Sequence, residues 1–360
     1  MNYQLVTTDS ELVTFCEKIK NSQQLALDTE FVRTRTYYPR LGLIQVYNAQ
    51  HLALIDPLNI QNWQCFTDIL KSAESQKYFH ACSEDLDVFM HEFNFIPQPL
   101  LDSQVVAAFL DNPISSGYAT LVNKYLGVEL DKSETRTDWL LRPLTDKQCH
   151  YAAADVYYLI PLMDKLIAQI NAKGWLAAAY EDCQLSITRK KQVLASADAY
   201  LVIKNAWQLK TEALSYLKRL AQWRLNYARQ HDIAVNFIVH EEVLWKIAKY
   251  KPTSLAELES LGMRGKEIRL YGQIILDFLK EPLTEMVEPI RQVIDYPDYK
   301  KIATHIKQQA EIVAKDADLS PELIVSRRQI NQYVKWLNKE EAEQPELLSG
   351  WRGELLKGRL

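Results

Sequence analysis

Short apolar runs with strand character fill the first half of the chain and stop near residue 195. Residues 25–31, 41–48 and 51–57 alternate apolar and polar side chains, with turn-forming residues between them, which predicts consecutive antiparallel strands. A further strand is expected at 77–81, and helices are expected at 83–93, 102–110, 119–127 and 145–174. This order predicts an α/β fold in which helices pack on a mixed sheet.

The helical stretch at 145–174 carries its own start and stop signals. Thr145 is a suitable N-cap, because its hydroxyl can accept a hydrogen bond from the first turn. Gly174 suits the left-handed residue that ends many helices, and Pro161 is expected to kink the helix between them. In 83–93, Ser83 is the expected N-cap, which places two acids in the first turn.

Beyond residue 195 the periodicity is helical throughout. Residues 232–239 (DIAVNFIV) resemble residues 318–325 (DLSPELIV), and an amphipathic helix precedes and follows each copy. The matching order predicts a duplicated helical unit. We therefore expect an α/β domain at 1–195, a small all-helical domain at 210–290, and a second helical domain at 295–360.

Composition excludes several classes of protein. The five cysteines are odd in number and contain no C-x-x-C pair, which disfavours a zinc site or a disulfide framework and favours a reducing compartment. The N-terminal residues do not resemble a signal peptide, and no apolar run approaches the ~20 residues of a membrane span, so a cytoplasmic location is expected. Net charge is −4, but bases outnumber acids over residues 204–280, which suits a polyanionic partner or an ordinary solvated helical surface.

Three acidic motifs stand at the ends of apolar runs. Asp28 and Glu30, in LALDTEF, share one face of a strand because side chains alternate with a period of two. Two such carboxylates can reach one cation, although a solvated pair at a strand end is the commoner explanation of this motif alone. Asp85 falls in the first turn of a helix, where the helix dipole stabilises an acid without any function.

The third motif, HYAAADVYYL, is the most specific. Tyr151 and Asp155 are four residues apart and so share a helix face, and the three alanines between them allow a close approach by a neighbouring sheet or a substrate. A packed helix with an exposed aspartate explains this motif alone equally well. Convergence of all three motifs would instead form a site for Mg²⁺ or Mn²⁺ that cleaves phosphodiesters.

The three motifs, in this order and with these spacings, resemble the DEDD superfamily of 3′–5′ exonucleases, and Tyr151 matches its tyrosine subclass. The segments DTEFVRTRTYYPRLGLIQVY, LDSQVVAAFL and HYAAADVYYLIPL, with His80 and Asp85 in H-x-x-x-x-D, are more specifically similar to the bacterial ribonuclease D family. The helical units resemble the HRDC domain. The resemblance implies an RNase H-like exonuclease domain followed by two HRDC-like domains.

The resemblance also implies roles for the five residues. Asp28, Glu30, Asp85 and Asp155 would hold two divalent ions, Mg²⁺ or Mn²⁺. Asp28 would bridge both ions, Glu30 and Asp155 would hold the ion that activates water, and Asp85 would serve the ion at the leaving 3′ oxygen, directly or through water. Tyr151 would orient the attacking water, because a phenol with a reference pKa of ~10 is a poor base at neutral pH.

The implied activity is 3′–5′ trimming of tRNA precursors and other small structured RNAs, with release of 5′-mononucleotides by a monomeric enzyme. Single-stranded ends are held by stacking and phosphate contacts. Candidate RNA-binding residues are Arg33, Arg35, Tyr38, Arg40, Gln45, Arg264 and Lys266. Two alternative functions also fit the sequence: a single-strand DNA 3′–5′ exonuclease, and a catalytically silent RNA-binding module.

Overall fold

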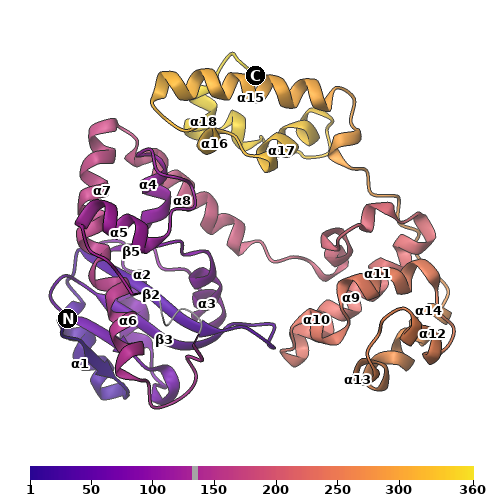
Figure 1. The fold of residues 1–360 in the computed structure, drawn as a ribbon, viewed down its shortest axis with the longest axis horizontal. Coiled ribbons are helices and arrows are strands. Elements are labelled where there is room, and N and C mark those ends of the chain that lie inside the picture. Colours follow the sequence, from indigo (N-terminus) through magenta and orange to yellow (C-terminus); the bar gives the residue numbers. More distant parts are fainter. Residues whose placement is uncertain (132–136) are drawn as a thin grey trace. The chain divides into compact units, whose positions relative to one another are not determined.

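The computed structural model describes residues 1–131 and 137–360 of the chain (Figure 1). These residues form two compact units. Unit 1 contains Met1–Val32, Arg40–Lys191 and Pro297–Leu360, and unit 2 contains Arg33–Pro39 and Gln192–Tyr296. A short segment between two strands of the sheet therefore folds with the helical unit that follows much later in the sequence.

Unit 1 is built on a six-stranded mixed sheet with the order β1-β4-β3-β2-β5-β6. The neighbours β2, β3 and β4 are antiparallel, as the sequence predicts. The other pairs are parallel: β1 with β4, β5 with β2, and β6 with β5. The strands are β1 (Gln4–Val6), β2 (Gln24–Val32), β3 (Arg40–Tyr47), β4 (Leu52–Ile55), β5 (Gln76–Phe79) and β6 (Leu100–Asp102). Leu25 and Leu27 of β2 are fully buried, so this central strand lies in the core.

Helices surround this sheet in unit 1 (Figure 1). They are α1 (Asp9–Ile19), α2 (Gln64–Lys71), α3 (Ser83–Phe93), α4 (Ser103–Ala108), α5 (Tyr118–Leu126), α6 (Asp146–Tyr157), α7 (Leu159–Lys173) and α8 (Leu176–Lys191), with a 3-10 turn η1 (Pro57–Asn59). Helix α6 packs against β2, β3 and β4, and α3 contacts β2 and β3. This packing brings the α6 motif to the sheet strand that carries the first acidic motif.

The local signals in 145–174 are confirmed. Thr145 and Gln148 form a reciprocal capping box at the start of α6, and Gly174 ends α7 in the left-handed conformation with φ of 78°. The helix breaks at Tyr158, three residues before Pro161, because a proline has no N–H for the preceding turn and its ring crowds the earlier carbonyl groups. Two helices, rather than one kinked helix, result.

The expected N-cap at Ser83 is wrong. Ser83 is the first residue of α3, and the preceding residue, Cys82, is the cap without a side-chain hydrogen bond. The N–H groups of Ala81 and Cys82 instead donate to the two carboxylate oxygens of Asp102, each at 2.9 Å. A residue from β6 therefore holds the entry to the helix, which local sequence does not reveal.

Unit 2 is helical. Its elements are α9 (Thr211–His231), α10 (Val235–Ile238), α11 (Glu241–Tyr250), α12 (Leu255–Ser260), α13 (Gly265–Glu267), a π turn η4 (Ile268–Gly272), α14 (Gln273–Lys280), and the 3-10 turns η2 (Ser196–Val202), η3 (Ala206–Gln208) and η5 (Val293–Asp295). Leu214, Leu217 and Leu220 of α9 are fully buried in its core. The apolar stripe of α9 thus organises this unit.

The duplicated helix order is present. Helices α9, α10 and α11 find counterparts in α15 (Tyr299–Ala317), α16 (Pro321–Ile324) and α17 (Arg327–Leu337), followed in the second copy by η6 (Glu346–Leu348) and α18 (Gly350–Leu355). Each long helix ends at an aspartate in the left-handed conformation, Asp232 with φ of 48° and Asp318 with φ of 52°. The shared left-handed helix end explains why both motifs begin with aspartate, since Asp tolerates this conformation better than most residues do.

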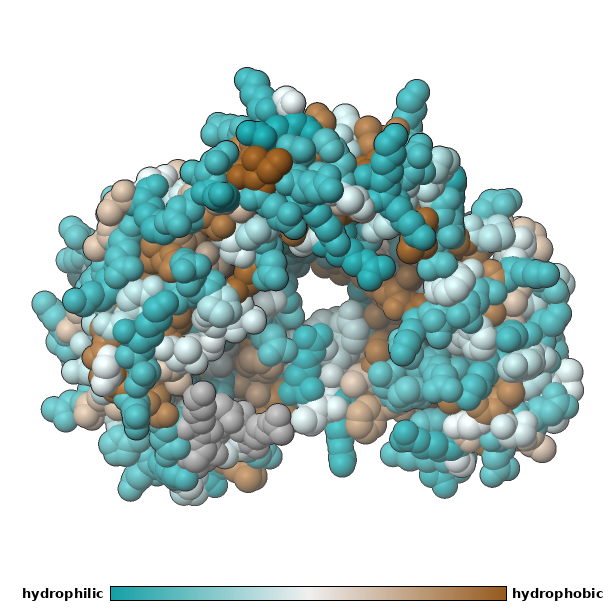
Figure 2. All heavy atoms as spheres, turned by 45° about the horizontal axis from the view of Figure 1, so that its top comes forward, coloured by the Kyte–Doolittle hydropathy of each residue, from teal (hydrophilic) through white to brown (hydrophobic). Residues whose placement is uncertain are grey.

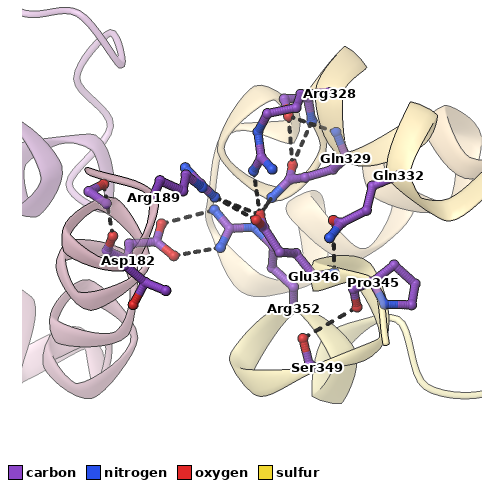
Figure 3. A network of polar contacts seen from close by, with 12 residues as sticks. Asp182, Arg189, Arg328, Gln329, Gln332, Pro345, Glu346, Ser349 and Arg352 are labelled. Carbon is purple, nitrogen blue, oxygen red and sulfur yellow. Dashed lines mark hydrogen bonds and ion pairs between the residues drawn. The ribbon is translucent and has the colours of Figure 1, made fainter. Parts of the chain in front are cut away.

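The C-terminal helices are fastened to α8 by a buried polar network (Figure 3). The Arg352 guanidinium donates to both carboxylate oxygens of Asp182, at 2.5 and 2.9 Å, and also to the carbonyls of Leu323 and Ile324. The indole N–H of Trp351 donates to Asp182 as well, at 2.9 Å. This fork geometry fixes α18 and α16 on α8 within unit 1.

A second carboxylate completes this network. Although burial opposes its ionisation, hydrogen bonds from Arg328 and Arg189 lower the pKa of Glu346 to about 2. Glu346 accepts from Arg189 on α8 at 2.7 Å and from Arg328 on α17 at 2.5 Å (Figure 3). The C-terminal helices therefore contact α8 through two separate carboxylates, Asp182 and Glu346.

Within residues 1–131 and 137–360, no helix has both the length and the apolar character needed to cross a membrane. On the face drawn in Figure 2, hydrophobic side chains form separate patches among hydrophilic ones. Such scattered exposure is ordinary for a globular protein and needs no special explanation.

Candidate active site

The first and third acidic motifs converge. Carboxylate oxygens of Asp28, Glu30 and Asp155 all lie within 4.8 Å of one another. Asp28 and Glu30 occupy one face of β2, and Asp155 reaches them from α6, which packs on that strand. The three acids would repel one another strongly without a compensating positive charge.

Asp85 adjoins this group from α3 but is held differently. One of its carboxylate oxygens accepts a hydrogen bond from the backbone N–H of Thr29 at 3.1 Å and another from the Thr29 hydroxyl. Strand β5 pairs with β2 only as far as Ala26, so the N–H of Thr29 has no strand partner on that side. Asp85 takes the place of the missing strand and is thereby positioned next to Asp28 and Glu30.

The pKa values of the four carboxyl groups record this crowding. Burial raises the pKa of Asp28 well above its ordinary value, and the charges of Asp85, Asp155 and Glu30 raise it further. Burial and the charges of Asp155 and Asp85 raise the pKa of Glu30 to about 9. In a protein without a bound cation, part of this cluster therefore stays protonated at neutral pH.

Asp85 and Asp155 are less perturbed. Burial raises the pKa of Asp85 to about 7, against the opposing hydrogen bonds from Thr29. Burial likewise raises the pKa of Asp155 to about 7, against a hydrogen bond from Tyr151. Each hydrogen bond favours the ionised form, which is the form that binds a cation.

The donor set fits a divalent metal. Every potential ligand is a carboxylate oxygen, which hard cations such as Mg²⁺ and Mn²⁺ prefer, and there is neither a thiolate nor an imidazole among the three convergent groups. A divalent cation would also remove the conflict that raises the pKa values of these acids. The site therefore has the chemistry of a divalent-metal centre.

Tyr151 lies beside these acids. Its hydroxyl donates a hydrogen bond to Asp155, and burial, together with the charges of Asp155, Glu30 and Asp28, raises its pKa above the ordinary value. The Tyr151 ring packs 6.2 Å, centroid to centroid, from Trp139, which is 2% exposed. Trp139 in turn lies against Gly42 of β3, where an added Cβ would come within 2.7 Å of the Trp139 carbonyl oxygen. The tyrosine is thus neutral at physiological pH and firmly placed.

A hollow of about 160 Å³ opens at these residues. Its lining consists of Leu27, Asp28, His80, Tyr118, Tyr151, Asp155 and Leu159. His80 and Tyr118 bring imidazole and phenol groups to the same space as the acids, and their rings lie 5.3 Å apart between centroids. The hollow is therefore a polar pocket with aromatic walls rather than an open acidic surface.

His80 enters the sequence argument only through the H-x-x-x-x-D motif, and the sequence assigns no role to Tyr118 or Thr29. His80 Nδ1 lies 2.8 Å from the Ser103 hydroxyl, and the Tyr118 hydroxyl donates to the Ala154 carbonyl at 3.3 Å. Burial, and then the charges of Asp155 and Asp28, raise the pKa of Tyr118 well above its ordinary value. These contacts join α4, α5, α6 and the residue that follows β5, so no spacing along one element could have indicated them.

The RNA-binding candidates that follow β2 lie in different environments. Arg33, Arg35 and Tyr38 belong to unit 2, where the Tyr38 N–H donates to Asp232 at 2.9 Å and the Arg35 carbonyl accepts from Ala234 at 2.9 Å. Arg40, at the start of β3, is exposed. These assignments to RNA stay predictions.

Gln45 of β3 differs from the other candidates. Its side chain is 0% exposed, and neither amide atom has a hydrogen-bond partner among the described residues. It stands directly opposite Asp28 in the β2–β3 register. Its burial leaves no surface of this side chain for RNA in the described structure.

The two candidates in unit 2 are exposed. Arg264 and Lys266 flank Gly265 at the start of α13, and the Arg264 N–H donates to the Glu267 carboxylate at 3.0 Å. The guanidinium Nε of Arg264 lies 3.6 Å from the same carboxylate. Both side chains are exposed, and their role in RNA binding stays a prediction.

Family models match three parts of the chain. Residues 3–171 match a 3′-5′ exonuclease domain, residues 213–279 match an HRDC domain, and residues 297–360 match the C-terminal HRDC domain of ribonuclease D. These matches agree with the predicted fold class of an exonuclease domain followed by HRDC domains.

Whole-chain similarities point the same way. The chain is 50% identical to ribonuclease D of Serratia proteamaculans, covering 100% of this chain and 98% of the relative, and 50% identical to ribonuclease D of Escherichia coli, covering 99% and 96%. The crystal structure of the E. coli RNase D, described as an exoribonuclease involved in structured RNA processing, superposes with a TM-score of 0.94 over 99% of this chain and 96% of that chain.

A more distant structure shares the fold alone. The catalytic core of RRP6 from Trypanosoma brucei is 21% identical, with a TM-score of 0.64 over 78% of this chain and 79% of that chain. The full-length relatives, the two HRDC matches and the convergent acids agree on one assignment. The chain belongs to the ribonuclease D family and is a hydrolytic 3′–5′ exoribonuclease.

Proposed function

We propose that this exoribonuclease trims the 3′ ends of tRNA precursors and other small structured RNAs and releases 5′-mononucleotides. The observation that carries the proposal is the cluster of Asp28, Glu30 and Asp155 oxygens within 4.8 Å, beside Tyr151, in a chain of this family. The E. coli relative is described as acting in structured RNA processing, which supports the substrate class.

The proposed centre uses two divalent ions, Mg²⁺ or Mn²⁺, held by Asp28, Glu30, Asp85 and Asp155. When bound, such ions supply an activated water and stabilise the charge on the leaving 3′ oxygen. Asp28 lies among the other acids, whose charges raise its pKa, and would be the residue that bridges the ions, while Asp85, held by Thr29, would serve the leaving-group side. The mutual repulsion of the four neighbouring carboxylates supports the binding of more than one cation by this cluster.

Tyr151 acts in this proposal by position. Its raised pKa keeps the hydroxyl protonated, so it donates to Asp155 and can hold a water in line with the scissile phosphate. In the hydrolysis, the water oxygen forms a bond to phosphorus, the bond from phosphorus to the 3′ oxygen breaks, and the shortened chain keeps a free 3′ hydroxyl.

We also propose the domain boundaries 1–195, 210–290 and 295–360, and RNA contacts by Arg33, Arg35, Tyr38, Arg40, Arg264 and Lys266, whereas the buried Gln45 is left out of this set. The exposed positions of Arg40, Arg264 and Lys266 support their part in this set. A monomeric state and a cytoplasmic location complete the proposal. The five free thiols support a reducing compartment.

The experiment is an end-trimming assay. The full chain is incubated with 3′-extended tRNA and Mg²⁺, and products are separated by length, with Asp155→Asn as the inactive control and EDTA as the metal control. Stepwise shortening with release of 5′-mononucleotides is expected. A single-stranded DNA of the same 3′ sequence runs in parallel, and faster loss of DNA than of the tRNA extension contradicts the proposed substrate.

A further inference from the structure

An aromatic stripe runs along the exposed side of α9 in unit 2. Trp223, Tyr227 and His231 are spaced four residues apart and therefore lie on one face of the helix. The centroids of Tyr227 and His231 are 4.1 Å apart with a tilt of 36°, and those of Trp223 and Tyr227 are 6.0 Å apart. Phe278 of α14 extends the stripe, 5.9 Å from Trp223. The result is a continuous aromatic wall.

This wall borders a hollow of about 470 Å³. A volume in the range of ~300–1,000 Å³ is typical of sites for small ligands or single chemical groups. Trp223 and Tyr227 are partly buried against the core of unit 2, so their rings are held from behind, while His231 is exposed. Rings that are supported on one side and open on the other are suited to stacking with a planar partner.

Three amide side chains edge the same hollow. Gln222, Asn226 and Gln230 also recur every four residues along α9 and line the hollow beside the aromatic stripe. None of the three has a hydrogen-bond partner in the part of the chain that the structure describes. Each amide offers both donors and an acceptor, so together they can serve the edge of any nucleobase.

Arg219 supplies a fixed positive charge at one end of the hollow. Its guanidinium donates to the main-chain carbonyls of Phe278 at 2.8 Å, Glu281 at 2.9 Å and Pro282 at 2.7 Å. Carbonyl groups carry no formal charge, unlike the carboxylates that pair with Lys218 and Lys251 elsewhere in unit 2. The residues that line the hollow include no acid. Its electrostatic character is therefore positive.

We propose that this hollow is a binding site for a nucleobase of single-stranded RNA, with the base stacked on the outer face of the exposed His231 ring, the amides at its edge and Arg219 toward a phosphate. A protein helix would require a mainly apolar groove, whereas this lining is half amide and charged. Aromatic faces combined with a positive charge and unpaired amides match the chemistry of single-stranded nucleic acid. The proposal rests on the proposed function, because it assigns this base to the RNA substrate.

The test measures RNA binding by the full chain. An Asp155→Asn background prevents cleavage, and a labelled single-stranded RNA of about twelve nucleotides, which lies in the range of known single-strand site sizes, is the probe. Gln230→Glu changes the hollow, and Gln208→Glu is the matched control: it makes the same substitution at an exposed position of unit 2 outside the hollow. His231→Ala removes a stacking ring without adding a charge.

Gln230→Glu and His231→Ala are each expected to weaken binding about tenfold, and the control less than about twofold. Photocrosslinking with RNA that carries 4-thiouridine is expected to mark residues 219–231. Equal RNA affinities for all three variants, or crosslinks that fall outside this segment, overturn the proposal. The hollow would then have to bind something other than RNA, such as a protein partner.

RNA binding by the variants in the Asp155→Asn background, compared with trimming by the unsubstituted chain, separates this proposal from the proposed function. If the α9 variants bind RNA as tightly as the control does, while the unsubstituted chain trims 3′-extended tRNA, only the proposed α9 site is wrong. If the unsubstituted chain fails to trim the tRNA, the proposed function is wrong, whatever α9 binds.

Discussion

The backbone N–H of Thr29 lies 3.1 Å from a carboxylate oxygen of Asp85, and the Thr29 hydroxyl donates to the same oxygen. A residue between two metal-binding candidates on β2 thereby fixes a third candidate from α3. The hydrogen bonds also lower the pKa of Asp85, against the effect of burial.

Thr29→Val should therefore raise the Mg²⁺ concentration that gives half-maximal trimming, because it removes the hydroxyl that favours ionised Asp85. A cost of about 1–3 kcal/mol in the free energy of unfolding is also expected, since the buried Asp85 carboxylate loses one of its two donors from residue 29 and keeps only the backbone N–H. Thr29→Ser is the control that keeps the hydroxyl. An unchanged Mg²⁺ requirement of Thr29→Val at neutral pH contradicts the role assigned to the hydroxyl.

Asp155→Asn should abolish trimming while RNA affinity changes little, because the substitution removes a metal-binding oxygen without altering basic surface. Binding is measured by anisotropy and cleavage by product length. Asp146→Asn, at the exposed start of the same helix, should keep both properties. Turnover of Asp155→Asn near the wild-type rate in Mg²⁺ rules out the site.

Tyr151→Phe should slow turnover by about 10²-fold, the size of effect that follows a small misplacement of a reacting group. Metal affinity should change little, since the tyrosine is not a carboxylate ligand. Isothermal titration with Mn²⁺ separates the two effects. A loss of Mn²⁺ affinity as large as that of Asp28→Asn shows that Tyr151 supports the metal site rather than the water.

Stability of the metal-free protein should fall as pH rises from about 4, the ordinary pKa of these acids, through about 7 and up to about 9. Within this window the unfolded chain has released protons that folded Glu30, Asp85 and Asp155 still retain, so each group costs roughly 1.4 kcal/mol per pH unit until its folded pKa is passed. Below about pH 4 both states are protonated and the effect is absent.

Mg²⁺ should therefore raise the melting temperature more at about pH 8.5 than at about pH 6, because more of the destabilising charge is then present for the cation to compensate. Calorimetry with Mg²⁺ or EDTA at the two pH values measures this difference. Asp28→Asn should reduce it. Equal stabilisation by Mg²⁺ at both pH values argues against metal binding by this cluster.

Asp182→Ala should destabilise unit 1 by about 3–5 kcal/mol, because it leaves the buried Arg352 guanidinium without its carboxylate (Figure 3). Lys173→Ala breaks the exposed pair with Asp318 and should cost less than about 1 kcal/mol. Urea unfolding compares the two variants. Similar costs for both would mean that the Asp182–Arg352 pair does not fasten the C-terminal helices.

Much of the fold follows from local sequence. The alternation in β2, β3 and β4 and the capping box at Thr145 are encoded within short segments, and the sequence predicts them correctly. The entry to α3 is not determined locally, since Asp102 from another strand accepts from the N–H groups of Ala81 and Cys82, and the predicted N-cap at Ser83 is wrong.

In the acidic site, too, the features encoded within one element are predicted, and the contacts between elements are not. The period of β2 predicts that Asp28 and Glu30 share a face, and the period of α6 predicts the same of Tyr151 and Asp155, but neither period measures the distance between the two elements. Thr29, His80 and Tyr118 reach the acids only through packing between elements, which depends on the whole arrangement of side chains in the core.

Residues 33–39 fold with unit 2, although they connect two strands of unit 1. There the Tyr37 hydroxyl accepts a hydrogen bond from Arg229 at 3.2 Å, and the Tyr38 N–H donates to Asp232. A chain shortened to residues 1–195 would lose both partners, and it would also leave Asp182 without Arg352. Excising residues 1–195 as a free enzyme would therefore leave polar groups without their partners at two separate places, the 33–39 segment and the α8 carboxylate.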